Sequence, residues 1–148
     1  IAMACVRETF EETGLALCRK ADVGPVAGPG WEALRARHLA PDLAALTYVG
    51  RAITPNTQRY RYHARFFSAS QNAVHGDIQP DGELEDILWL TVDQALKLKS
   101  LSVTSYMLQR AVNDAEQPAR DDCVKPLFAV RRGLPGIWLG RRWRALSE

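Results

Sequence analysis

The sequence contains no long apolar run, no closely spaced pair of cysteines and no large excess of one charge. No apolar stretch approaches the roughly 20 residues that a membrane-spanning helix needs. No secretory signal peptide is visible either. The three cysteines, Cys5, Cys18 and Cys123, are odd in number and lie far apart, so we expect reduced thiols and neither a disulfide framework nor a zinc site. We therefore expect a cytoplasmic protein without a membrane partner.

The charge balance gives no support for strong electrostatic binding to nucleic acid. Lys and Arg total 19 and Asp and Glu total 17, which gives a formal net charge of +2. So small an excess does not support nucleic-acid binding by bulk electrostatics. The 148 residues, 47% hydrophobic and 24% charged, are typical of an ordinary globular protein with one core. We expect a single domain over residues 1–148.

Three glutamates are crowded on one helical surface near the start of the chain. The apolar spacing predicts a helix over Ala2–Thr13, which places Glu8, Glu11 and Glu12 at positions i, i+3 and i+4. Like charges at this spacing destabilise a helix, and carboxylates near its C-terminus oppose the helix dipole. A bound cation would offset both costs, and Mg²⁺ prefers oxygen ligands of this kind. The alternative is an amphipathic helix with a solvated acidic face.

The stretch Arg7–Leu15 resembles the second half of the signature of the Nudix hydrolases, R-E-U-x-E-E-x-G-U, where U is an apolar residue. Thr9 at the first apolar position is the one departure. Gly14 is the expected helix C′ residue. The resemblance implies a Nudix-type α/β/α sandwich with a mixed β-sheet. It also implies hydrolysis of a pyrophosphate bond in a small nucleotide-type substrate, in which a nucleoside diphosphate is linked to another group. Mg²⁺ would be the cofactor, with Mn²⁺ as the alternative.

In that family the signature begins with a Gly and a further Glu upstream of this Arg. The present chain begins at Ile1, so those positions and the first strands of the fold would lie before it. We therefore expect the chain to be an N-terminally incomplete Nudix domain.

The resemblance also assigns roles to individual residues. It makes Glu8, Glu11 and Glu12 the metal ligands and catalytic carboxylates, and Arg7 the residue that orients them by ion pairing. Nudix hydrolases commonly carry another catalytic Glu on a loop that faces the metal helix. The candidates are Glu85 first, Glu83 second and then Asp86, although a solvated acidic turn would look the same.

Two strands follow in the middle of the chain. β-branched and aromatic residues predict strands over Thr47–Ile53 and Arg59–Ser68. Alternation along the second strand places Arg61 and Arg65 on one face. Together with Arg51, these arginines could bind substrate phosphates, because a guanidinium contacts phosphate oxygens bidentately. An exposed polar sheet face is the alternative.

The same region carries a looser, second resemblance. Ile53-Thr54-Pro55, Arg59-Tyr60 and Arg65-Phe66-Phe67 resemble a T-P…R-[FY]…R-F-F pattern found in larger Nudix proteins, among them enzymes that cleave coenzyme A and its esters. This resemblance favours a coenzyme A-like substrate. ADP-ribose-like nucleotides are the other leading class, and oxidised nucleoside triphosphates rank behind both.

Other elements are expected from their local patterns. Thr91 is the expected N-cap of a short helix, Met107 is expected in the core, and Trp89 is expected to fill the core from a short apolar strand. The remaining expected elements are a strand entered at Leu15–Leu17, helices over Trp31–Leu39, Thr91–Leu98 and Ser102–Ala115, a turn through Leu46, a strand over Leu127–Val130 and a turn at Leu134–Gly136.

Two further functions remain open at this point. The basic-aromatic C-terminal stretch, with Arg131, Arg132, Arg141, Arg142 and Arg144, could contact an acidic ligand, nucleic acid or the second subunit of a homodimer, and a solvated tail is the simpler interpretation. The second alternative is a Nudix-fold module that binds a nucleotide without turning it over. The intact Glu8, Glu11 and Glu12 argue against that module.

Overall fold

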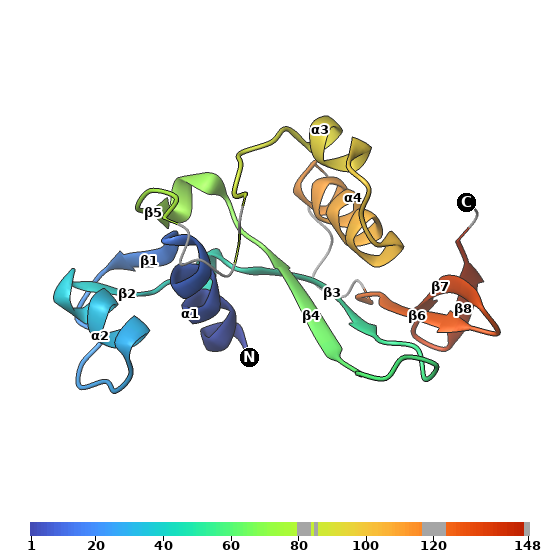
Figure 1. Ribbon diagram of the computed structural model, residues 1–148, viewed down its shortest axis with the longest axis horizontal. Helices are drawn as coiled ribbons and strands as arrows, with labels where there is room; N and C mark the ends of the chain where they lie inside the picture. Colours follow the sequence, from blue (N-terminus) through green and yellow to red (C-terminus); the bar gives the residue numbers. More distant parts are fainter. Residues whose placement is uncertain (80–83, 85, 117–123, 147–148) are drawn as a thin grey trace. The chain divides into compact units, whose positions relative to one another are not determined.

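The fold belongs to the α/β class, as the sequence predicts. The computed structural model describes residues 1–79, 84, 86–116 and 124–146 (Figure 1). Within these residues the strands form a three-stranded and a five-stranded sheet. The chain divides into two compact units, one of Ile1–Thr47 with Ala69–Trp89 and the other of Tyr48–Ser68 with Leu90–Glu148. No helix in the described ranges has both the length and the apolar character needed to cross a membrane.

The first unit contains two helices and a small antiparallel sheet. Strand β1 lies in the middle of the sheet order β2-β1-β5 and pairs antiparallel with both neighbours. The helices and strands are α1 (Ala2–Thr13), β1 (Ala16–Lys20), α2 (Pro29–Ala36), β2 (Leu39–Pro41) and β5 (Val74–His75), with 3-10 turns at Leu43–Ala45 and Gln71–Ala73.

The core of this unit joins α1 to β1 and α2. Val6 and Phe10 lie one helical turn apart on α1 and are buried together with Leu17 of β1 and Leu34 of α2. This spacing is the apolar stripe expected of an amphipathic helix. Burial of these side chains therefore sets which face of α1 remains available to solvent.

The second unit is built on a mixed sheet. Its strand order is β4-β3-β6-β7-β8, in which β3 and β6 are parallel while β6–β7 and β7–β8 are antiparallel. The elements are β3 (Thr47–Ile53, whose first residue belongs to the first unit), β4 (His63–Ser68), α3 (Val92–Lys97), α4 (Ser102–Glu116), β6 (Leu127–Arg131), β7 (Leu134–Leu139) and β8 (Arg142–Ala145).

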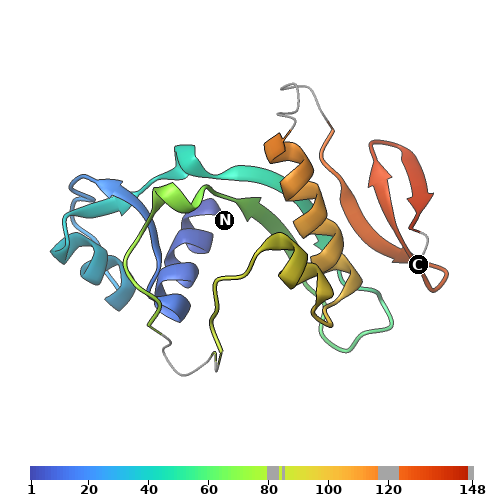
Figure 2. The ribbon, with the colours of Figure 1, turned by 90° about the horizontal axis from the view of Figure 1, so that it is seen from above.

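Helix α4 covers part of one face of this sheet (Figure 2). Met107 of α4 is buried against Val49, Phe128 and Ile137 of the strands, which confirms its expected place in the core. A Cβ atom on Gly50 of β3 would lie only 3.2 Å from the Met107 sulfur. The close approach of helix and strand therefore depends on the absence of a side chain at that position.

Several predicted elements are confirmed. Helix α1 and strand β3 have the expected bounds, and α4 ends one residue after the expected position. Thr91 caps α3 through a capping box, in which its hydroxyl accepts from the backbone N–H of Gln94 and the Gln94 side chain accepts from the N–H of Thr91.

Other boundaries differ from the prediction. The helix expected over Trp31–Leu39 ends at Ala36, because His38 adopts a left-handed φ of 55° and Leu39 enters β2. The strand expected over Arg59–Ser68 begins only at His63. The chain before it forms a loop that is closed by hydrogen bonds between Thr54 and Tyr62.

Two predictions near the C-terminal half are wrong. Trp89 is 58% exposed and the described residues around it form no strand, because a short apolar run without a pairing partner does not itself specify one. The turn expected at Leu134–Gly136 lies instead at Arg132 and Gly133, both at positive φ. Gly136 lies in β7, where a Cβ atom would come within 2.4 Å of the Trp143 ring.

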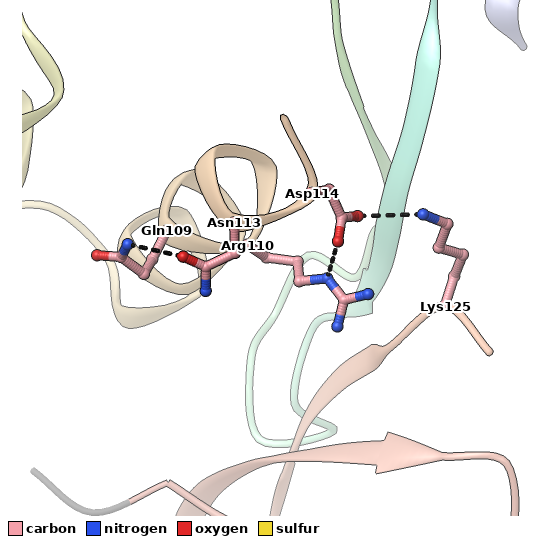
Figure 3. Close-up of polar contacts among 5 residues, drawn as sticks. All are labelled: Gln109, Arg110, Asn113, Asp114 and Lys125. Carbon is pink, nitrogen blue, oxygen red and sulfur yellow. Dashed lines mark hydrogen bonds and ion pairs between the residues drawn. The ribbon is translucent and has the colours of Figure 1, made fainter. Parts of the chain in front are cut away.

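An ion-pair network connects the end of α4 with the start of β6 (Figure 3). The Asp114 carboxylate accepts from Arg110 Nε at 2.8 Å and from Lys125 Nζ at 3.1 Å, and its side chain is only 9% exposed. Gln109 donates to Asn113 along the same helix. Asp114 therefore pairs with one cation from its own helix and with one from the segment that leads into β6.

Substitution Asp114→Asn is expected to lower the free energy of unfolding by about 1–2 kcal/mol, because two half-buried cations lose their charged partner. Urea denaturation monitored by circular dichroism measures the change. Glu116→Gln, which removes an exposed carboxylate from the last turn of the same helix, is the control and should have little effect. Equal losses in both variants would contradict a specific role for the network.

The two described cysteines are free thiols, as expected, whereas Cys123 lies outside the described residues. Cys18 lies in the core of the first unit. Burial raises the pKa of its thiol from the ordinary value of 9.0 to about 11, and the Asp42 carboxylate adds to the shift. The folded protein therefore keeps this thiol protonated and unreactive at neutral pH.

This raised pKa predicts a pH dependence of stability. Below pH 9 the thiol is protonated in both states and its contribution is complete; between about pH 9 and 11 only the unfolded chain releases the proton, so stability falls. The difference in unfolding free energy between the native chain and Cys18→Ala should shrink across that interval. The pKa of Tyr106 is also raised by burial, so Tyr106 adds its own pH dependence to the stability of both proteins. That contribution cancels in the difference between them. A difference that is constant from pH 8 to 11 would refute the prediction.

Candidate functional site

Helix α1 presents its glutamates on the side of the helix that the core leaves open. Val6 is 1% exposed and Phe10 9% exposed, so these two side chains define the packed face. Glu8 is exposed, while Glu11 and Glu12 are half-buried. The helix can therefore pack on β1 and still offer carboxylate oxygens to a ligand.

Arg7 lies between two of these carboxylates. Its guanidinium pairs with Glu8 through Nη2 and with Glu11 Oε2 through Nη1, the latter at 3.3 Å. All three side chains are at least 32% exposed, and ion pairs of this kind each stabilise a helix by at most about 1 kcal/mol. Arg7 thus pairs with Glu8 and Glu11 while offsetting only part of their charge, and its predicted role in orienting metal ligands stays a prediction.

Helix α2 approaches α1 at Gly30. A Cβ atom at this position would lie 2.3 Å from Oε1 of Glu11, so the carboxylate occupies the space that any side chain would need. Gly30 follows Pro29, whose fixed φ suits the first turn of a helix. The Glu11 carboxylate therefore pairs with Arg7 and lies next to the α2 backbone at Gly30.

A second close approach lies at the C-terminus of α1. Gly14 ends the helix at φ 75° and donates its N–H to the Phe10 carbonyl oxygen at 2.9 Å. The segment after β5 crosses here, since Gln79 donates its N–H to the Thr13 carbonyl oxygen at 2.8 Å. A Cβ atom on Gly14 would come within 2.8 Å of the Asp77 carbonyl oxygen.

The resemblance predicts an additional catalytic carboxylate among Glu83, Glu85 and Asp86. The described part of the segment after β5 meets the end of α1 at Gly76 and Asp77. Glu83 and Glu85 lie outside the described residues. Asp86 is described and exposed.

A cavity of about 250 Å³ opens between these elements of the first unit. Its charged lining consists of Glu11, Asp77 and Arg37, and the Arg37 guanidinium lies 5.4 Å from the centre of the Phe10 ring. Carboxylate oxygens suit a hard cation, and a guanidinium suits a phosphate. Sequence reasoning missed both Arg37 and Asp77, since neither belongs to a recognisable spacing. The cavity is lined by Phe10, Glu11, Gly14, Pro29, Gly30, Ala33, Arg37, Asp77 and Gln79.

The fit of this site to a divalent metal rests on its donor chemistry. Within the described ranges, no three Asp, Glu, His or Cys side chains are grouped closely enough to hold a metal ion. Glu8, Glu11, Glu12 and Asp77 nevertheless supply only oxygen donors, the ligand type that Mg²⁺ and Mn²⁺ prefer. Mg²⁺ usually retains several waters and takes only one or two protein carboxylates, so a helix that presents two oriented carboxylates suits it.

The arginines expected to bind phosphate lie in the second unit. Arg51 is exposed on β3, Arg65 is exposed on β4, and Arg61 is exposed in the loop before β4. From the predicted site, the structure brings together Arg7, Glu8 and Glu11 by direct contact. The roles of the three arginines stay predictions.

Comparison of the chain with models of protein families, with curated proteins and with solved structures gives no significant match. The resemblance of Arg7–Leu15 to the Nudix signature therefore stays a prediction from the residues themselves.

The close approach at Gly14 can be tested with two glycines that share a conformation. Gly14 and Gly24 have φ of 75° and 76°, but an added Cβ would meet backbone only at Gly14. Gly24→Ala should lower the free energy of unfolding by about 1 kcal/mol, the cost of the left-handed backbone alone. Gly14→Ala should lower it by about 2–4 kcal/mol, because the crossing segment must also shift. Equal losses in urea denaturation would contradict the described crossing.

Proposed function

We propose that this chain is a Nudix-type hydrolase, which cleaves the pyrophosphate bond of a nucleoside diphosphate linked to another group. The observation that carries the proposal is the arrangement of α1, in which Arg7 orients Glu8 and Glu11 on the face left open by the core. The proposed family also implies an α/β/α sandwich. The α/β class described above is compatible with that fold.

In the proposed site, Mg²⁺, with Mn²⁺ as the alternative, would take one or two of its ligands from Glu8, Glu11 and Glu12 and the others from water. The bound ion would supply a Lewis acid for the diphosphate oxygens. The chain's own residues position these carboxylates: Arg7 bridges Glu8 and Glu11, and the bare backbone of Gly30 leaves space for the Glu11 carboxylate.

Proton transfer and substrate binding require further residues. We propose that Glu85, or else Glu83, accepts a proton from the attacking water, which a carboxylate can do when it lies within hydrogen-bonding reach. Support for this assignment comes from the resemblance alone. Arg37 lines the cavity next to Glu11 and could contact a phosphate of the substrate. Arg51, Arg61 and Arg65 are the further candidates for phosphate binding.

The proposed substrate is a coenzyme A-like or ADP-ribose-like nucleotide, of which the second resemblance favours the coenzyme A-like class. Localisation in the cytoplasm and assembly as a homodimer are parts of the same proposal. Specificity for one substrate depends on pocket contacts that the family signature does not contain.

Removal of the Glu12 carboxylate tests the proposed hydrolase activity. Glu12→Gln keeps the size of the side chain but removes its charge, and turnover with Mg²⁺ should fall by about 10²-fold or more because a ligand of the cation is lost. The assay follows release of a nucleoside monophosphate or phosphopantetheine from coenzyme A and ADP-ribose, with Mg²⁺ and with EDTA. The matched control is Glu116→Gln on α4, which should retain activity.

Two outcomes would contradict the proposal. Turnover that survives Glu12→Gln would remove the carboxylate helix from the mechanism. A folded protein that binds these nucleotides but cleaves none of them would favour the nucleotide-binding module instead.

A further inference from the structure

A second and larger cavity lies wholly within the second unit. Its volume is about 780 Å³, within the roughly 300–1,000 Å³ that small-molecule sites usually occupy. Strands β3, β4 and β6 contribute Ala52, Phe66 and Phe128 to its lining, and the first turn of α4 contributes Val103. This cavity opens beside α4, where the helix leaves part of the sheet face uncovered.

Aromatic side chains dominate its rim. Tyr60 and Tyr62 lie two residues apart in the loop before β4, and both line the cavity while remaining 65% and 67% exposed. Phe66 of β4 is a third aromatic residue in the lining. Exposed aromatic rings at the mouth of an apolar cavity offer planar surfaces on which a ligand ring can stack.

Hydrogen bonds fix the shape of this rim. Thr54 donates its N–H to the Tyr62 carbonyl oxygen at 3.0 Å, and its hydroxyl accepts from the Tyr62 N–H, also at 3.0 Å. Within the loop, Gln58 donates its N–H to the Pro55 carbonyl oxygen at 3.1 Å. A rim that is held before binding lowers the entropic cost of ordering it around a ligand.

The charge in the lining of this cavity is positive. Among the described residues that line it, Arg59 alone carries a formal charge. Its guanidinium lies 5.4 Å from the centre of the Tyr60 ring, and in the described part of the chain no carboxylate forms an ion pair with it. A guanidinium that stacks on an aromatic ring can still donate in its own plane to an anion.

We propose that this cavity binds a small planar aromatic anion. The ring of the ligand lies among Tyr60, Tyr62 and Phe66, and its anionic group accepts hydrogen bonds from Arg59. The positive charge of Arg59 disfavours a cationic ligand. An aliphatic anion cannot stack on the tyrosine rings. The proposal does not depend on the proposed hydrolase activity, because it uses none of the residues assigned to the hydrolase site.

Isothermal titration calorimetry of the full chain with three compounds tests this proposal. The compounds are 2-naphthoate, its neutral isostere 2-naphthamide, and the aliphatic anion octanoate. We expect one molecule of 2-naphthoate to bind per chain, about tenfold more tightly than either of the others, because it alone satisfies both the charge and the stacking surface.

Variants locate the site. Arg59→Gln should weaken binding of 2-naphthoate about tenfold, to the level of 2-naphthamide, and leave 2-naphthamide unchanged. Tyr62→Ala should weaken both aromatic compounds about fivefold or more, through loss of stacking. Arg35→Gln, which removes another exposed arginine outside the cavity lining, is the matched control and should not alter binding. Circular dichroism establishes that each variant is folded.

Amide chemical shifts give a readout that does not depend on affinity. Addition of 2-naphthoate should perturb the amides of Ala52, Phe66 and Thr104, which line the cavity from three elements. Absence of saturable binding, perturbations confined to other residues, or equal affinity in the native chain and Arg59→Gln would each overturn the proposal. Binding of 2-naphthoate should persist in EDTA and in the Glu12→Gln variant. Failure of this binding proposal is therefore distinguishable from failure of the hydrolase assignment.

Discussion

Packing of Val6 and Phe10 is the constraint on which the candidate site depends. Burial of these two side chains against β1 and α2 fixes the rotation of α1 about its axis. The side chains that must then face away from the core are those of Glu8, two residues after Val6, and of Glu11 and Glu12, directly after Phe10. The same contacts that stabilise the unit therefore concentrate three like charges on one surface, at a cost in helix stability that Arg7 offsets only in part.

Bare backbone at three glycines brings other elements close to this surface. Gly30 lets α2 reach the Glu11 carboxylate, and Gly14 and Gly76 let the segment after β5 cross the end of α1. At each position an added Cβ would lie 2.8 Å or less from another atom. These contacts give the glutamate helix an enclosed side, where Arg37 and Asp77 meet Glu11 in a small cavity. The site thus depends on glycines as much as on its charged residues.

Local patterns predicted local structure well and distant contacts poorly. The periodicity of α1, the β-branched run of β3 and the cap at Thr91 each act within a few residues, and each prediction is confirmed. Gly136 was misassigned to a turn because its real constraint is the Trp143 ring on the neighbouring strand. Arg37 and Arg59 were not identifiable as cavity residues for the same reason. Their surroundings come from residues far away in sequence, which no spacing reveals.

The central claim is that the carboxylates of α1 hold a divalent cation. Paramagnetic broadening of amide resonances by Mn²⁺ tests it most directly, because broadening falls steeply with distance from the ion and needs no knowledge of the substrate. Titration of the isotopically labelled chain with substoichiometric Mn²⁺ should first broaden the amides of Glu8, Glu11 and Glu12, and excess Mg²⁺ should reverse the effect. Broadening that begins at other acidic residues, or that Glu12→Gln leaves unchanged, would contradict the account.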